Sequence, residues 1–197
     1  MNSIEEVRNA MVTLSRHIMK MFVSMNNYCE YFDPYLAPHA ALSITIDGCM
    51  ESGKDCSAGG AKYNSYGGTA TGLATVADSL TTIKYMCFDN NYCTTRELYD
   101  ALMADWEGYE PLRQRVLNEV PRYGNDIKYV DDIAAEAMEI FAAEFLKCTN
   151  DRGTVWQAGI YPVSTHIVNG KRCWATPDGR KASQAFAPGA NPMHGRD

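Results

Sequence analysis

The sequence predicts an α/β protein that is mostly helical, with a few short strands near its C-terminal end. Two observations carry this prediction. The chain opens with a long apolar pattern of helical period, and from Val155 onward the pattern becomes β-rich. The segments between them show further helical periodicity and recognisable N-terminal caps.

The first helix is predicted from apolar residues that recur at alternating spacings of three and four, which places them on one buried stripe. Ser3 and Glu6 form a capping box in front of this stripe. The stripe consists of Ile4, Val7, Met11, Leu14, Ile18, Met21 and Met25.

The segment that follows predicts extended structure. Two prolines between Asp33 and Pro38 favour an extended connector. Leu42, Ile44 and Ile46 then alternate with polar residues, as in a short strand. Glycines interrupt any regular element between Cys56 and Leu73.

Four more helices are predicted in the middle of the chain. Apolar spacing predicts helices over 73–87 and 130–146, and a helix over 110–118 ends before Pro121. Thr94 and Glu97 form the capping box of the remaining helix.

The C-terminal part predicts strands and turns. A strand pattern runs from Val155 to Val168 and leads into Asn169-Gly170, which is the strongest short hairpin signal. We therefore expect a β-hairpin near 155–175. Thr176 to Arg180 predicts another turn, with Asp178-Gly179 at its apex.

Composition excludes several classes of protein. The 197 residues are 46% hydrophobic and 21% charged, which excludes a disordered chain. A net charge of -6 without runs of Lys or Arg argues against nucleic acid or an anionic membrane as the partner. A small molecule or another protein fits better.

Targeting and cysteine usage indicate a reducing cytoplasm. No apolar run is long enough to span a bilayer, and the acidic first helix does not resemble a signal peptide. The seven cysteines form no C-x-x-C pair, so we expect neither a disulfide framework nor a metal site.

The most enzyme-like site on residue chemistry alone is Cys49 with Glu51. A thiol beside a carboxylate can serve radical or nucleophilic chemistry, with the glutamate as acid or base. The alternative is a buried structural cysteine and a surface glutamate. It is favoured because no histidine lies nearby in the sequence to activate the thiol.

Five runs carry a resemblance to a known family: GCMESGKDCSAGGAKYN (48–64), GLATVADSL (72–80), PRYGNDIKYVDDIA (121–134), GIYPVSTH (159–166) and ATPDGRKA (175–182). Together they resemble the glycyl radical enzymes, the family of pyruvate formate-lyase, and in particular its dehydratase and lyase branch. Their order and spacing also fit the family, and the resemblance covers nearly the whole chain from Pro38.

The resemblance implies that residues 1–197 are one internal segment of a pyruvate formate-lyase-like domain, part of a ten-stranded α/β barrel wrapped by helices. In the family one loop carries a thiyl cysteine and another a glycyl radical. The block 48–80 is similar to a region downstream of the thiyl loop, so Cys49 is only a look-alike and the thiyl cysteine is expected before Met1. No Arg-Val-x-Gly-Tyr run occurs, so the glycyl radical domain is expected to be absent as well.

The resemblance also implies substrate-binding residues. The segment 159–166 is similar to a strand that lines the substrate pocket in related lyases. Tyr161, Val163 and Thr165 would share one face of such a strand. We therefore expect Tyr161 and Thr165 to bind substrate, and no catalytic residue in this chain.

The implied function is that of a fragment of an anaerobic lyase or dehydratase. The full-length enzyme would cleave a C–O, C–N or C–C bond of a small polar substrate by thiyl-initiated hydrogen abstraction, as a homodimer. No cofactor would bind this chain directly, and a radical SAM activating enzyme would install the glycyl radical. The fragment alone would be inactive. Two alternatives remain: a non-catalytic split or truncated gene product, and a self-contained thiol enzyme that uses Cys49 and Glu51.

Overall fold

The computed structural model describes residues 1–195 and confirms a mostly helical α/β chain. Arg196 and Asp197, the last two residues of the predicted segment, lie outside the described residues. The chain folds into two compact units. Unit 1 comprises residues 1–12, 69–140 and 159–197, and unit 2 comprises residues 13–68 and 141–158. No helix within 1–195 has the length and apolar character needed to cross a membrane.

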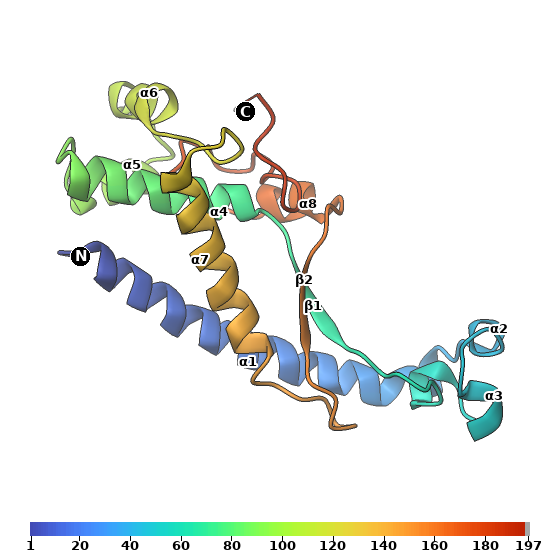
Figure 1. Cartoon of the computed structure of the whole chain (residues 1–197). Coiled ribbons are helices and arrows are strands. Elements are labelled where there is room, and N and C mark those ends of the chain that lie inside the picture. Colours follow the sequence, from blue (N-terminus) through green and yellow to red (C-terminus); the bar gives the residue numbers. More distant parts are fainter. Residues whose placement is uncertain (196–197) are drawn as a thin grey trace. The chain divides into compact units, whose positions relative to one another are not determined.

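Unit 1 contains most of the predicted helices (Figure 1). They are α4 (Leu73–Thr82), a π-helical continuation η2 (Ile83–Asp89), α5 (Thr95–Met103), α6 (Glu110–Glu119) and the first part of α7 (Lys128–Phe145). Unit 1 also contains α8 (Thr165–Lys171), which was not predicted. Apolar spacing located most of the predicted helices, and a short-range cap located α5. Thr94 Oγ1 accepts a hydrogen bond from Glu97 N at 3.1 Å, and Glu97 Oε2 accepts one from Thr94 N at 2.7 Å. The predicted capping box is therefore confirmed.

The core of unit 1 forms where η2, α5 and α6 pack together. Trp106 is fully buried at its centre, and its indole Nε1 donates to Arg180 O at 3.3 Å. A buried tryptophan needs such a partner for its N–H group. The buried members are Met86, Cys87, Cys93, Leu98, Ala101, Trp106, Val116 and Val120.

Unit 2 has a small aromatic core. Phe145 and Trp156 stack with ring centroids 5.8 Å apart, and Phe22 meets both rings edge-on. Val23 from α1 (Ile4–Leu36) closes the cluster. Short elements complete the unit: α2 (Ala40–Ser43), α3 (Cys49–Ser52) and the 3-10 turn η1 (Cys56–Ala58).

The strands β1 (Gly67–Ala70) and β2 (Gln157–Ile160) pair in parallel (Figure 1). Gln157 N donates to Tyr66 O at 2.8 Å, and Tyr161 N donates to Ala70 O at 3.4 Å. Parallel strands need a long connection, and the helices between residues 73 and 145 provide it.

Two predictions for the region 33–46 were wrong. The expected connector is the last turn of α1, which continues through Pro34, and Ala37 N donates to Asp33 O at 2.9 Å. The expected strand is replaced by α2 and a turn. Ser43 Oγ bonds to His39 O and to Asp55, at 2.9 and 2.8 Å. Such side-chain bonds favour a turn over a β-ladder.

The predicted stripe of α1 is only partly buried. Ile4, Val7 and Met11 are half-buried, but Leu14, Ile18, Met21 and Met25 are 55–61% exposed. The buried residues of α1 are instead Val23 and Glu30. Apolar periodicity predicted the helix correctly but not the face that packs within this chain.

The hairpin predicted near 155–175 was also wrong. Asn169 and Gly170 lie inside α8. Gly170 is packed against the following segment, where a Cβ would lie 2.3 Å from Gln184 O. The antiparallel bridge joins Thr149 and Val155 instead. Asn150 Oδ1 closes that turn by accepting from the amides of residues 152 and 154, at 3.1 and 2.8 Å.

The two strands contain glycines with opposite steric requirements. A Cβ on Gly68 of β1 would lie 2.2 Å from Phe145 Cζ, whereas one on Gly159 of β2 would meet nothing within 4 Å. Gly68→Ala is therefore expected to lower the free energy of unfolding by about 1–3 kcal/mol through overpacking. Gly159→Ala is the matched control, expected to stay close to the wild-type chain in guanidinium denaturation. Equal effects of the two substitutions would contradict the packing described for the aromatic core.

Candidate substrate-contact site

The segment that carries Tyr161 and Thr165 is not one strand, contrary to prediction. β2 ends at Ile160, and Thr165 is the first residue of α8. Between them Val163 N donates to Tyr161 O at 3.0 Å, which closes a tight three-residue turn centred on Pro162. Strand alternation therefore does not determine which side chains share a face here. The Tyr161 side chain is 63% exposed, and Thr165 is exposed as well.

This turn rests on Gly189. Its φ of 56° lies in the left-handed region, and a Cβ there would lie 2.8 Å from the N and Cα atoms of Pro162. Only glycine satisfies both conditions. The backbone that presents Tyr161 is thus supported by a residue far along the sequence.

The start of α8 is fixed locally and at a distance. His166 Nδ1 lies 2.8 Å from Val163 O, and Phe186 N donates to His166 O at 3.2 Å. The imidazole is thus engaged with its own turn. These bonds hold the helical turn that carries Thr165.

The segment 186–189 also crosses the N-terminal end of α4. Ala187 N donates to Thr75 Oγ1 at 2.9 Å, and Leu73 N donates to Gly189 O at 3.3 Å. Ala187 and Thr75 are buried, so each of these groups relies on the other for hydrogen bonding. The segment 186–189 is therefore bonded to α4 and in turn supports both the Tyr161 turn and the start of α8.

Arg180 organises the predicted turn at 176–180, which is confirmed by the bond from Thr176 N to Arg180 O at 3.1 Å. The residue is 2% exposed. Its Nη1 donates to the carbonyls of Gln184 and Lys181 at 2.7 and 3.2 Å, and its Nε donates to Thr176 Oγ1 at 3.0 Å. Its Nη2 donates to Trp174 O.

The Arg180 guanidinium also lies over the Phe186 ring, 4.6 Å from its centroid. Its Nε, Nη1 and Nη2 atoms all donate to backbone carbonyls or to the Thr176 hydroxyl, and the residue is buried, so its charge is not presented to a ligand. Sequence reasoning did not assign a role to Arg180 or Thr75. The ATPDGR run was the one sequence signal for Arg180. No sequence pattern near Thr75 indicates its bond to Ala187, which lies far along the chain.

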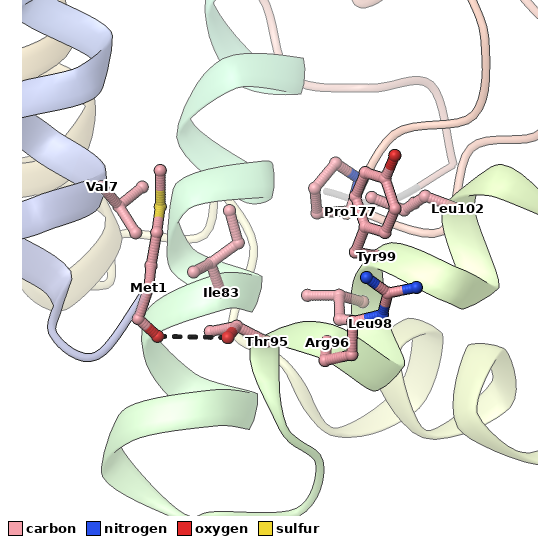
Figure 2. A pocket seen from close by; sticks show the side chains of 9 residues that line it. All are labelled: Met1, Val7, Ile83, Thr95, Arg96, Leu98, Tyr99, Leu102 and Pro177. Carbon is pink, nitrogen blue, oxygen red and sulfur yellow. Dashed lines mark hydrogen bonds between the residues drawn. The ribbon is translucent and has the colours of Figure 1, made fainter.

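A second candidate location is a groove of about 440 Å³ in unit 1, shown in Figure 2. Its polar contact is a hydrogen bond from Thr95 Oγ1 to Met1 O at 3.1 Å. Neither Tyr161 nor Thr165 lines it, and an apolar lining of this kind suits packing better than chemistry on a polar substrate. The lining residues are Met1, Val7, Ile83, Thr95, Arg96, Leu98, Tyr99, Leu102 and Pro177.

Cys49 and Glu51 lie in unit 2 and do not form an activated pair. Cys49 is the first residue of α3 and is 3% exposed, whereas Glu51 is exposed. Desolvation raises the pKa of the Cys49 thiol, and Cys56 and Asp55 raise it further. A protonated, buried thiol is a poor nucleophile. Among residues 1–195, no group of three His, Cys, Asp or Glu side chains is arranged to hold a metal ion.

Residues 1–170 match the protein family described as pyruvate formate lyase-like, over most of the chain. The chain belongs to this family of glycyl radical enzymes. It is 32% identical to trans-4-hydroxy-L-proline dehydratase of Clostridioides difficile over 99% of its own length and 25% of that protein. It is 36% identical to (2S)-3-sulfopropanediol dehydratase of Klebsiella oxytoca over 81% of its length and 19% of that protein.

A solved structure supports the same family assignment. The B12-independent glycerol dehydratase from Clostridium butyricum superposes on the whole chain with a TM-score of 0.93 and 36% identity, over 25% of that chain. The chain thus spans about a quarter of the length of the relatives it matches. These relatives confirm the predicted family and its enzymatic character.

In this glycyl radical enzyme segment the motif-like run PRYGND is also structural. Arg122 Nη2 donates to Val116 O at 2.6 Å, and Tyr123 N donates to Asp78 Oδ1 at 2.9 Å. Gly124 has a φ of 97°, and a Cβ there would lie 2.6 Å from the Pro192 ring. The runs that carry the resemblance therefore join distant segments within unit 1.

The bond between Thr75 and Ala187 can be tested by two substitutions. Thr75→Val keeps the side-chain shape but leaves the buried Ala187 amide without an acceptor, which costs about 1–3 kcal/mol. Thr75→Ser keeps the hydroxyl and is expected to restore most of this loss. Urea denaturation measures both variants. If the valine variant were as stable as the serine variant, the 186–189 segment would not depend on this bond.

Proposed function

We propose that this chain forms part of the substrate-pocket wall of a glycyl radical dehydratase or lyase, and that Tyr161 and Thr165 contact the substrate. The observation that carries the proposal is a pair of exposed hydroxyl side chains, Tyr161 at a turn whose backbone is fixed and Thr165 at the start of α8. Gly189 supports that turn, and Phe186 N binds the start of α8. Preorganised donors of this kind orient a ligand at little entropic cost.

The chemistry suits a polar substrate. A phenol and an aliphatic hydroxyl each donate one hydrogen bond and accept others. Such hydroxyl groups can hold a hydroxyl, amine or sulfonate group while a neighbouring bond is broken. The named substrates of two relatives, hydroxyproline and sulfopropanediol, carry such groups.

In the complete enzyme we propose that a thiyl radical abstracts a hydrogen atom from the substrate and that a C–O, C–N or C–C bond is then cleaved. A glycyl radical, installed by a radical SAM activating enzyme, supplies the thiyl radical when present. Residues of this chain would bind and orient the substrate and exclude water around it. Cys49 has no part in the proposed step, because the run 48–80 resembles a family region downstream of the thiyl loop. Its burial fits a structural thiol.

The proposed setting is anaerobic and cytoplasmic, with the complete enzyme as a homodimer. All seven cysteines are free thiols, which fits a reducing compartment. A non-catalytic split product is the competing assignment, and the neighbouring reading frame separates the two. In-frame Gly-Cys-x-Glu and Arg-Val-x-Gly-Tyr sequences on either side would support the enzyme.

Tyr161→Phe and Thr165→Val test the proposal in the longer polypeptide that contains these residues. Removing one substrate hydrogen bond of about 1.4 kcal/mol lowers kcat/KM roughly 10-fold. The assay measures turnover of hydroxyproline, glycerol and 3-sulfopropanediol, with the glycyl radical quantified by electron paramagnetic resonance. Tyr63→Phe, at a tyrosine that is 83% exposed in unit 2, is the matched control.

The expected pattern is reduced turnover of the accepted substrate by the two pocket variants, an unchanged radical content, and no effect of the control. Wild-type kcat/KM in both pocket variants would remove Tyr161 and Thr165 from the substrate site. Turnover of none of these compounds, with a full complement of radical, would point to a different substrate class.

A further inference from the structure

Two cysteines meet inside unit 1, away from the Tyr161 turn. Cys87 lies in η2, and Cys93 immediately precedes Thr94, the N-cap of α5. Their sulfur atoms are 3.7 Å apart, and the residues are 7% and 9% exposed. Within residues 1–195 this is the pair of cysteines whose sulfurs lie within contact distance of each other.

We propose that Cys87 and Cys93 form a redox-active dithiol that a small-molecule disulfide oxidises to an intramolecular disulfide bond.

The backbone already brings the two residues together. Tyr92 N donates to Met86 O at 2.8 Å, and Cys93 N donates to the same carbonyl at 3.4 Å. These bonds close the short loop between η2 and α5 and hold Cys93 beside Cys87. A bonded S–S distance is about 2.05 Å, so the sulfurs must approach by less than the width of one atom. A change of side-chain rotamer can supply this approach without unfolding either helix.

The loop between the cysteines gives an oxidant a route to the pair. Residues 89–92 are all exposed, and Asn91 has a φ of 52°, which marks a tight turn at the surface. Both cysteines belong to the core cluster that contains Leu98 and Trp106, but Cys93 directly follows this exposed loop, whereas Cys87 lies within η2. Cys93 is therefore the sulfur that a small disulfide reaches first.

The electrostatics assign the same roles. The two sulfurs share a contact in which either can be the donor. This contact lowers the pKa of Cys93, although burial and the Glu97 carboxylate oppose the shift. The same contact, together with burial, raises the pKa of Cys87. The thiolate is the reactive form of cysteine, so Cys93 is the attacking group and Cys87 the resolving group.

The reaction consists of two exchanges. The Cys93 thiolate attacks one sulfur of the small disulfide, a mixed disulfide forms, and the first thiol leaves. Cys87 then loses its proton and attacks the Cys93 sulfur, which forms the Cys87–Cys93 bond and releases the second thiol. The protein loses two hydrogen atoms and two electrons, and the small disulfide is reduced to two thiols.

The test treats the folded 197-residue chain with bis(2-hydroxyethyl) disulfide, blocks remaining thiols with N-ethylmaleimide at low pH and maps the peptides by mass spectrometry. We expect a peptide in which Cys87 and Cys93 have together lost two hydrogen atoms. Exposed Cys29 should carry only the mixed disulfide. Cys87→Ser should accumulate the mixed disulfide at Cys93, and Cys93→Ser should leave Cys87 unmodified. Cys29→Ser is the control and should not change the rate of pairing.

Three results would overturn the proposal. In the first, Cys29 reacts while both cysteines of the pair remain available to maleimide. In the second, the pair is cross-linked only after urea is added, which would mean that the folded state holds the sulfurs apart. In the third, wild-type protein stops at a mixed disulfide on Cys93 that Cys87 never resolves.

Discussion

The C-terminal part of unit 1 depends on the hydrogen bonds that the buried Arg180 guanidinium donates. Arg180 is a cation that is 2% exposed, and burying such a group is costly unless its N–H groups are bonded. The carbonyls of residues 174, 181 and 184 and the Thr176 hydroxyl meet this requirement. The turn at 176–180 and the segment after it are therefore folded around one side chain.

This constraint extends to the proposed substrate contacts. Phe186 lies under the Arg180 guanidinium, and its amide binds the start of α8. Ala187 then binds Thr75 of α4, and Gly189 supports the turn that carries Tyr161. The positions of Tyr161 and Thr165 are thus set by contacts made more than twenty residues away in sequence. Their surroundings could not have been read from the strand pattern alone.

The parts of the structure that the sequence predicted are those governed by local chemistry. The α5 helix begins where Thr94 and Glu97 exchange hydrogen bonds, and α6 and α7 follow their apolar spacing. The failures have distant causes. Asn169-Gly170 is a hairpin signal in isolation, but Gly170 lies in α8, where the absence of a Cβ lets the backbone of Gln184 approach closely. Similarly, the resemblance to glycyl radical enzymes indicated Tyr161 and Thr165, whereas Thr75 gave no signal because its partner is Ala187.

Hydrogen exchange in Arg180→Lys tests the central claim most directly. Lysine keeps the charge but cannot reproduce the planar set of donors that reaches all four acceptors. The account predicts faster exchange of the Phe186 and Ala187 amides than in the wild-type chain, with the Glu97 amide at the α5 cap unchanged. Wild-type exchange rates at Phe186 and Ala187 would contradict the organising role of Arg180.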